Sequence, residues 1–395
     1  MKSEHDMPMR ALAAAVLAWC LAWTAVPAAA AEPELTPFVA EALWAPNPAF
    51  GSDGRRHLVY ELRIANTTAS GLELKTVEVL DEPSGKVLLS LDRNGLGKRF
   101  SIGGRRGAEA TDLGVGQFGV LFLHVALEPG DALPRAIAHR ISLRLVQPGI
   151  DFSATVARTP VVDRPLVVLG PPLIGAGYVA ADGCCDSIRH VRALLALNGH
   201  FTLAQRFAID WEQIDSENRL VRGDTKTLSN YVIYGRDVLA VADGTVVSSR
   251  NDLPEQVPGA LPQGMTIDQA DGNFVVLDIG GGSYVLYAHM QPGSVTVKAG
   301  AKVKRGDVLG KVGNTGNTQA PHLHLHVMDG PSPLQSNGIP YVFDSFKLTA
   351  IDKAGTADFD KAEATGSPLT LTPVSPPQVL SQVLPLDLTV VEFSR

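Results

Sequence analysis

The chain has 395 residues, with 34 Lys and Arg against 41 Asp and Glu, which gives a formal net charge of −7 at pH 7. This balance argues against a nucleic-acid-binding protein and against a strongly basic surface that would hold anionic polymers. Short β-branched runs separated by Gly, Pro and Asn-Gly outnumber helical patterns, so we expect a mostly β protein. Its length predicts two domains.

The first 31 residues have the pattern of an export signal. Arg10 precedes an apolar run over residues 11–26, and small residues at 27–31 offer cleavage sites. The run is short for a membrane span, and no later segment is long and apolar enough for one. We therefore expect residues 1–31 to be a signal peptide and the protein to be periplasmic or extracellular.

Residues 38–162 contain repeated short strand patterns with turn residues between them, which predict an immunoglobulin-like β-sandwich. His57, His124 and His139 lie inside apolar strands and are expected to be structural. The predicted strands are residues 57–66, 72–80, 86–91, 118–127 and 138–146.

The second half of the chain is expected to hold the functional domain. Residues 163–180 are rich in proline and predict a linker, followed by a β-rich domain with antiparallel sheets over residues 181–350. Residues 351–395 are expected to form a partly disordered tail, because residues 354–378 are rich in Ala, Thr, Ser and Pro. A segment at 384–393 has the pattern of an edge strand.

A glycine-rich turn at residues 313–316 leads into a strand that carries three histidines at every second position. Side chains alternate along a strand, so His322, His324 and His326 are expected on one face, with residues 323, 325 and 327 in the core. Neutral imidazole is a good zinc ligand, and two imidazoles this close can place one nitrogen on a metal and another beside a substrate oxygen. The strand therefore predicts a catalytic metal site.

The chain from about residue 185 to 345 resembles the lysostaphin/LytM-type zinc endopeptidases, which cleave peptidoglycan peptides. A single His-x-His would be weak evidence, but here several blocks occur in the order that the family shows. The blocks are Arg206–Asp210, Val238–Val246, Gly272–Leu277, Tyr287–Met290, Val303–Gly310, Gly313–Gly316 and Pro321–His324.

The resemblance implies one zinc ion per chain, held by a histidine, an aspartate and the second histidine of His-x-His. Asp210 and His324 occupy two of these places. The place of the first histidine falls on Arg206, which stays protonated and cannot bind zinc. His190 and His200 are the two candidates to replace it.

Local geometry favours His190. Residues 192–197 and 200–204 predict a β-hairpin closed by Asn198-Gly199, in which facing residue numbers sum to 397. If the second strand continues to Asp210, His200 lies at the hairpin tip, roughly 30 Å away, and His190 lies opposite residue 207. We predict His190 as the ligand, with His200 as the alternative if residues 201–204 form a loop.

The resemblance gives His289 and His322 the catalytic roles. Two imidazoles beside the zinc can orient or deprotonate a water and stabilise the oxyanion formed at a peptide carbonyl. His326 departs from the family, and we weigh a role behind the metal ligands or at the substrate against a structural role. Arg206 is expected either to hold an anion or carboxylate or to be a surface charge.

The adjacent Cys184 and Cys185 leave three states open: a reduced buried pair, a vicinal disulfide, or thiolate coordination near His190.

The function predicted from these features is an exported zinc metalloendopeptidase that hydrolyses peptide bonds of peptidoglycan with a zinc-activated water. The alternative is a catalytically inactive domain of the same fold that binds wall peptides or regulates another cell-wall hydrolase. The arginine at position 206 is the feature that supports this alternative.

Overall fold

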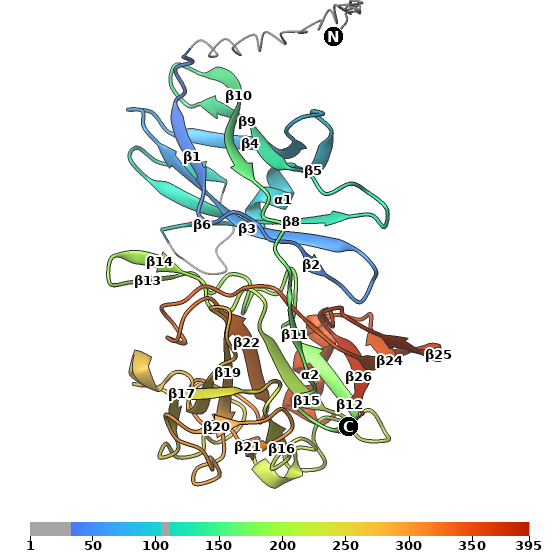
Figure 1. Cartoon of the computed structure of the whole chain (residues 1–395). Coiled ribbons are helices and arrows are strands. Elements are labelled where there is room, and N and C mark those ends of the chain that lie inside the picture. The colour runs from blue at the N-terminus through green and yellow to red at the C-terminus, as the bar shows by residue number, and fades with distance from the viewer. Residues whose placement is uncertain (1–32, 104–110, 395) are drawn as a thin grey trace, which may run out of the picture. The chain divides into compact units, whose positions relative to one another are not determined.

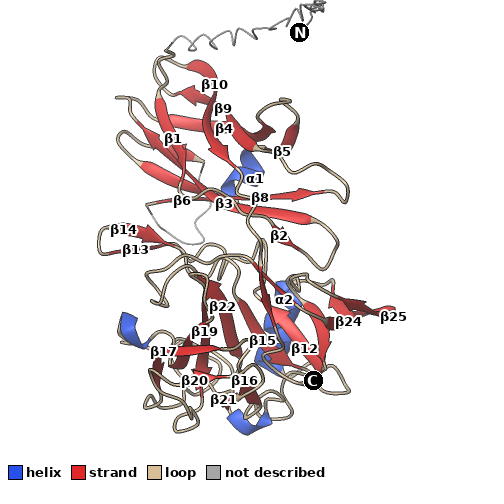
Figure 2. Ribbon diagram, viewed as in Figure 1, coloured by secondary structure: helices blue, strands red, loops and turns tan. Residues whose placement is uncertain are grey.

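The computed structural model describes residues 33–103 and 111–394, and the predicted signal peptide lies outside them. Figure 1 shows the order of the elements, and Figure 2 shows that strands far outnumber helices in the described ranges. The prediction of a mostly β protein with antiparallel sheets is confirmed. None of the helices in the described ranges has the length and apolar content of a membrane span. The described residues from 37 onward form one compact unit.

Residues 38–160 form two five-stranded sheets that share one core. Alternate residues of the predicted strand at 57–66, among them Leu58, Tyr60 and Leu62, point into this core and are fully buried. The immunoglobulin-like arrangement itself stays a prediction. One sheet contains β1 (Phe38–Ala42), β2 (Ala49–Phe50), β3 (Arg56–Asn66), β6 (Phe100–Ile102) and β8 (Phe118–Leu127), and the other contains β4 (Leu72–Asp81), β5 (Val87–Leu91), β7 (Asp112–Leu113), β9 (Ala136–Leu145) and β10 (Ile150–Pro160), with helix α1 (Arg93–Gly97) between β5 and β6.

A ten-stranded sheet carries the second half of the chain (Figure 1). Leu323, Leu325 and Val327 lie in the main core below it, as predicted, so the histidines between them face the other side. In spatial order the sheet contains β20 (Lys302–Val303), β17 (Gly244–Arg250), β18 (Asn273–Asp278), β19 (Tyr284–Met290), β22 (Leu323–Met328), β15 (Ile209–Gln213), β12 (Gly175–Ala181), β26 (Thr389–Phe393), β24 (Phe346–Asp352) and β25 (Leu371–Leu380).

Three two-stranded ladders complete the described strands. They are β11 (Val167–Leu169) with β23 (Tyr341–Phe343), which is parallel, β13 (Leu195–Leu197) with β14 (His200–Thr202), and β16 (Asp237–Leu239) with β21 (Val308–Lys311).

Residues 163–180, predicted as a linker, contain β11 and most of β12, which together make up half of that length. β11 pairs with β23, and β12 lies between β15 and β26 inside the large sheet. Tyr178 and Val179 are buried there, so apolar packing overrides the proline signal of the preceding residues.

Residues 351–394, predicted as part of a partly disordered tail, contain one helix and two strands. Helix α2 (Thr356–Thr365) packs Phe359 and Ala362 against Val179 of the large sheet. The proline-rich segment forms β25 at the sheet edge, where missing backbone N–H groups are tolerated. β26, predicted as an edge strand, is an inner strand between β12 and β24.

Candidate metal and active site

Three neighbouring strands place the central residues of the site. β22 pairs with β15 on one side and with β19 on the other, so His324 lies opposite Asp210 and opposite Ala288. His324 Nδ1 is 2.7 Å from Asp210 Oδ1, although the two residues are 114 positions apart. The antiparallel register therefore brings together the aspartate and histidine predicted as metal ligands.

His190 reaches the same point from a loop over residues 182–190. Its Nδ1–H donates to the carbonyl oxygen of Asp182 at 2.8 Å, which leaves the lone pair of Nε2 free. Nε2 lies 3.2 Å from Asp210 Oδ2. His200 is exposed at the tip of the β13–β14 hairpin. The structure thus brings His190, and not His200, to Asp210.

The predicted hairpin forms around its turn, but the predicted continuation of its second strand to Asp210 does not form. Leu195, Ala196 and Leu197 face Thr202, Phe201 and His200, in the predicted register. The second strand ends at Thr202, and residues 203–208 turn before β15 begins. His190 therefore reaches Asp210 through its own loop and not by pairing with residue 207.

The donor set suits a divalent cation. His190, Asp210 and His324 each offer a ligand atom, and these atoms lie within 4.8 Å of one another. Two imidazoles and one carboxylate form a common protein ligand set for zinc. Lone pairs of neutral imidazoles and carboxylate oxygens repel at such distances unless a proton or a metal ion lies between them. A second group that could hold a metal, His289, His322 and His324, contains no anionic ligand.

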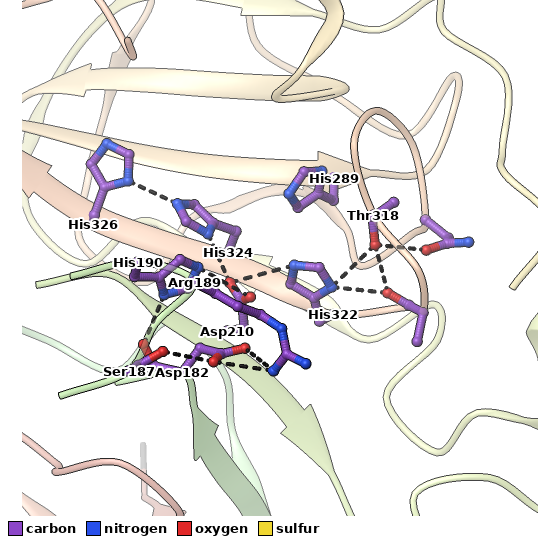
Figure 3. Close-up of polar contacts among 12 residues, drawn as sticks. Asp182, Ser187, Arg189, His190, Asp210, His289, Thr318, His322, His324 and His326 are labelled. Carbon is purple, nitrogen blue, oxygen red and sulfur yellow. Dashed lines mark hydrogen bonds and ion pairs between the residues drawn. The ribbon is translucent and has the colours of Figure 1, made fainter. Parts of the chain in front are cut away.

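Polar contacts join Asp210 to three imidazoles of the site (Figure 3). Burial alone would lower the pKa of His190, but the Asp210 carboxylate raises it to about 9. Burial alone would raise the pKa of Asp210, but the imidazoles of His190, His322 and His324 hold it well below its usual range. The site is therefore built around one carboxylate that stays ionised.

His289 and His322 lie beside this group with their ring centroids 4.7 Å apart. The Nδ1–H of His289 donates to the Thr315 carbonyl at 2.7 Å, and that of His322 donates to the Ala320 carbonyl at 2.8 Å. Both Nε2 atoms therefore carry free lone pairs when the rings are neutral. Burial lowers the pKa of His289 well below its ordinary value, which keeps this ring neutral.

His289 has a backbone φ of 64°, a conformation that residues other than glycine rarely adopt. Its backbone N–H donates to the Asp271 carbonyl at 3.1 Å, so the surrounding structure holds this conformation. Non-glycine residues in this region often occur at functional sites.

His326 lies behind His324. Its Nδ1 is 2.8 Å from His324 Nε2, and the whole side chain is buried. Its own Nε2 has no hydrogen-bond partner among the described residues.

Arg206 does not contact this cluster. It donates to Glu61 of β3 and to the carbonyl of Gly338, and it lies over the ring of Trp44. Of the two roles weighed for Arg206, the structure shows the pairing with a carboxylate, and it rules out an exposed surface position.

The sequence did not reveal the groups that orient the imidazoles. Asp182, Thr315 and Ala320 act through backbone carbonyls, which any residue type provides. It also missed α2, whose Asp360 binds Arg189 on the His190 loop. A cavity of about 390 Å³ lies beside this helix, lined by Arg189, Thr225, Lys226, Tyr231, Pro258, Gly259, Gln319, Asp360, Glu363 and Ala364.

The structure thus gathers histidines and an aspartate that could hold a metal ion beside one antiparallel β-sheet. Residues 228–336 match the model of Peptidase family M23. The resemblance predicted from the sequence is therefore confirmed for this part of the chain, which matches an M23 peptidase domain. The matched range contains His289, His322 and His324, whereas His190 and Asp210 precede it.

Curated relatives agree with this match. An "Uncharacterized metalloprotease" of Haemophilus influenzae is 29% identical over 210 residues, which are 49% of this chain and 39% of the relative. The "Peptidoglycan DD-endopeptidase ShyA" of Vibrio cholerae is 33% identical over 102 residues, which are 26% of this chain and 20% of the relative. This chain thus spans less than half the length of both relatives.

Among solved structures, the catalytic domain of lysostaphin from Staphylococcus simulans is similar with 20% identity. The match covers 42% of this chain and 88% of that chain, with a TM-score of 0.23.

Proposed function

We propose that the protein is an exported zinc metalloendopeptidase that hydrolyses peptide bonds of peptidoglycan. The observation that carries the proposal is the convergence of His190, Asp210 and His324 from three separate parts of the chain. The M23 match and the relative named as a peptidoglycan endopeptidase support the substrate class. The pattern of residues 1–31 supports export.

In this proposal His190 Nε2, an oxygen of Asp210 and His324 Nδ1 hold one zinc ion. When bound, zinc would supply Lewis acidity toward the peptide carbonyl and would make a water more acidic. The contact between His190 Nδ1–H and the Asp182 carbonyl fixes the tautomer that this ligand needs.

In this proposal His289 and His322 serve in proton transfer. Each presents a free Nε2 lone pair, because a backbone carbonyl accepts its Nδ1–H. One neutral ring can take a proton from the attacking water and later donate it to the leaving amine. The depressed pKa of His289 suits it to the neutral form, which accepts the proton.

The inactive alternative depended on Arg206 at the expected place of the first ligand. His190 lies against Asp210 in its stead, and Arg206 is engaged with Glu61. The feature that favoured a binding or regulatory role therefore has a structural explanation, which supports the proposal of an active enzyme.

The test is digestion of cross-linked peptidoglycan fragments, with products separated by chromatography and identified by mass. We expect the wild-type protein to release peptides and His322→Ala to retain zinc but lose activity about 10²–10⁴-fold. His200→Ala is the matched control, because this histidine is exposed on the hairpin, and it should keep full activity. A zinc-loaded wild-type protein that cleaves no peptide bond would overturn the proposal in favour of the binding role.

A further inference from the structure

A third group of side chains that could hold a metal ion lies outside the site described above. His57 of β3, His124 of β8 and Cys185 of the 182–190 loop each offer a ligand atom, and these atoms lie within 4.8 Å of one another. His57 and Cys185 are buried, and His124 is partly exposed. Cys185 forms a disulfide with Cys184, so its sulfur is not a free ligand in this state.

In each of the two imidazoles, one ring nitrogen contacts a carboxylate. His57 Nε2 lies 3.0 Å from Asp53 Oδ1, and His124 Nδ1 lies 2.9 Å from Asp186 Oδ2. Because a carboxylate only accepts, each of these nitrogens carries the proton when its ring is neutral. Histidines that bind metals are commonly oriented by a carboxylate on the second nitrogen in this way.

The other ring nitrogens of His57 and His124 face each other. His57 Nδ1 and His124 Nε2 are 2.9 Å apart, and in this tautomer both present lone pairs. Two acceptors at such a distance need a cation, which is either an additional proton or a metal ion. The two carboxylates supply the negative charge that compensates a divalent cation.

We propose that His57, His124 and Cys185 form a second zinc site, which becomes available when the Cys184–Cys185 disulfide is reduced. Two imidazoles and one thiolate match the nitrogen and sulfur ligands that zinc prefers, and a water can fill the fourth position. The partly exposed side chain of Asp186 marks the side from which solvent reaches the group.

Reduction of the disulfide balances in electrons and protons. A dithiol reductant gives two electrons and two protons to the Cys184–Cys185 bond, which becomes two thiols, and the dithiol becomes a disulfide. Cys185 then releases its thiol proton to solvent as its sulfur binds the metal. Cys185 stands on the same loop as His190, so the second site links the redox state of the protein to the loop that carries a ligand of the first.

The test counts zinc and detects the thiolate ligand in the full mature chain. We expect one zinc in the oxidised protein and two after treatment with dithiothreitol. Cys184→Ser leaves Cys185 free without any reductant and should hold two, whereas Cys185→Ser, its matched control, should hold one under all conditions.

Cobalt(II) provides a second readout that does not depend on the first site, because His190, Asp210 and His324 include no sulfur. Cys184→Ser loaded with cobalt should show thiolate-to-cobalt charge-transfer absorption, and adding His124→Ala should abolish it. One zinc and no charge-transfer absorption in Cys184→Ser would overturn the second site. Loss of zinc from His324→Ala variants, by contrast, reports only on the first site.

Discussion

Arg206 donates two hydrogen bonds to the Glu61 carboxylate, from Nε at 3.0 Å and from Nη2 at 2.8 Å. Both side chains are buried, and the two residues are 145 positions apart. The arginine that takes the expected place of a zinc ligand is therefore a structural residue, which joins β3 to the turn before β15.

Removing one partner of this ion pair should be far more harmful than removing both. Glu61→Ala leaves a buried guanidinium without its carboxylate, and we expect the free energy of unfolding to fall by about 3–5 kcal/mol in urea denaturation. The double variant Glu61→Leu/Arg206→Met should lose much less, because no charge stays buried. An alanine variant within about 1 kcal/mol of wild type would contradict this account of the pair.

His326 should tune the affinity of the first zinc site. With His324 Nδ1 turned toward Asp210, the Nε2–H of His324 donates to His326 Nδ1. His326→Phe removes this acceptor, so zinc affinity should fall about 10–100-fold in titrations against a competing chelator. His326→Gln, whose amide oxygen can accept the same bond, is the control and should restore most of the affinity. Equal affinities of the Phe variant and wild type would show that His326 is passive.

The turn at Gly316 should tolerate no side chain. Gly316 has a φ of +86°, and a Cβ there would lie 2.3 Å from the backbone nitrogen of Gly272. The preceding Thr315 carbonyl orients His289, so Gly316→Ala should destabilise the fold by about 3 kcal/mol and lower kcat. Gly293→Ala is the control, with a φ of +75° and open space around its Cβ, and should cost about 1 kcal/mol. Similar losses for both variants, measured by urea denaturation, would argue against the close approach.

His139 should make the protein less stable in mild acid. Burial lowers the pKa of His139 to about 4, and the ring is hydrogen-bonded to Tyr60 and to the Ala157 carbonyl. The unfolded chain binds a proton near pH 6.5, so stability falls as the pH drops from about 6.5 to about 4, by roughly 3 kcal/mol.

The measurement is the urea midpoint at pH 7 and pH 5 for wild type, His139→Gln and the control His200→Gln. His139→Gln should lose part of the pH dependence, and His200→Gln should keep it. An unchanged pH dependence in His139→Gln would contradict the assignment.

Regular patterns made much of the fold predictable from the sequence. The strand Phe118–Leu127 has the predicted bounds, and alternation correctly placed Leu323 and Leu325 in the core. Prediction failed where long-range packing decides the structure. The Ala, Thr, Ser and Pro content of residues 354–378 suggested disorder, but β25 pairs with β24 at a sheet edge, where its prolines are accommodated.

The residue types of the candidate site could be predicted from the sequence, but their arrangement in space could be predicted only in part. The strand at 322–326 and the aspartate at 210 could be found because spacing and resemblance both point to them. The route of the 182–190 loop could not, because it depends on backbone contacts such as that between His190 and the Asp182 carbonyl. The unusual φ of His289 likewise has no signal in its residue type.

The most direct measurement is the zinc content of the oxidised mature protein, determined by elemental analysis for wild type, His190→Ala and His200→Ala. We predict one zinc per chain in wild type and in His200→Ala, and loss of tightly held zinc in His190→Ala, because this variant lacks the ligand beside Asp210. Full zinc retention by His190→Ala, or no zinc in wild type after reconstitution, would contradict the proposed site.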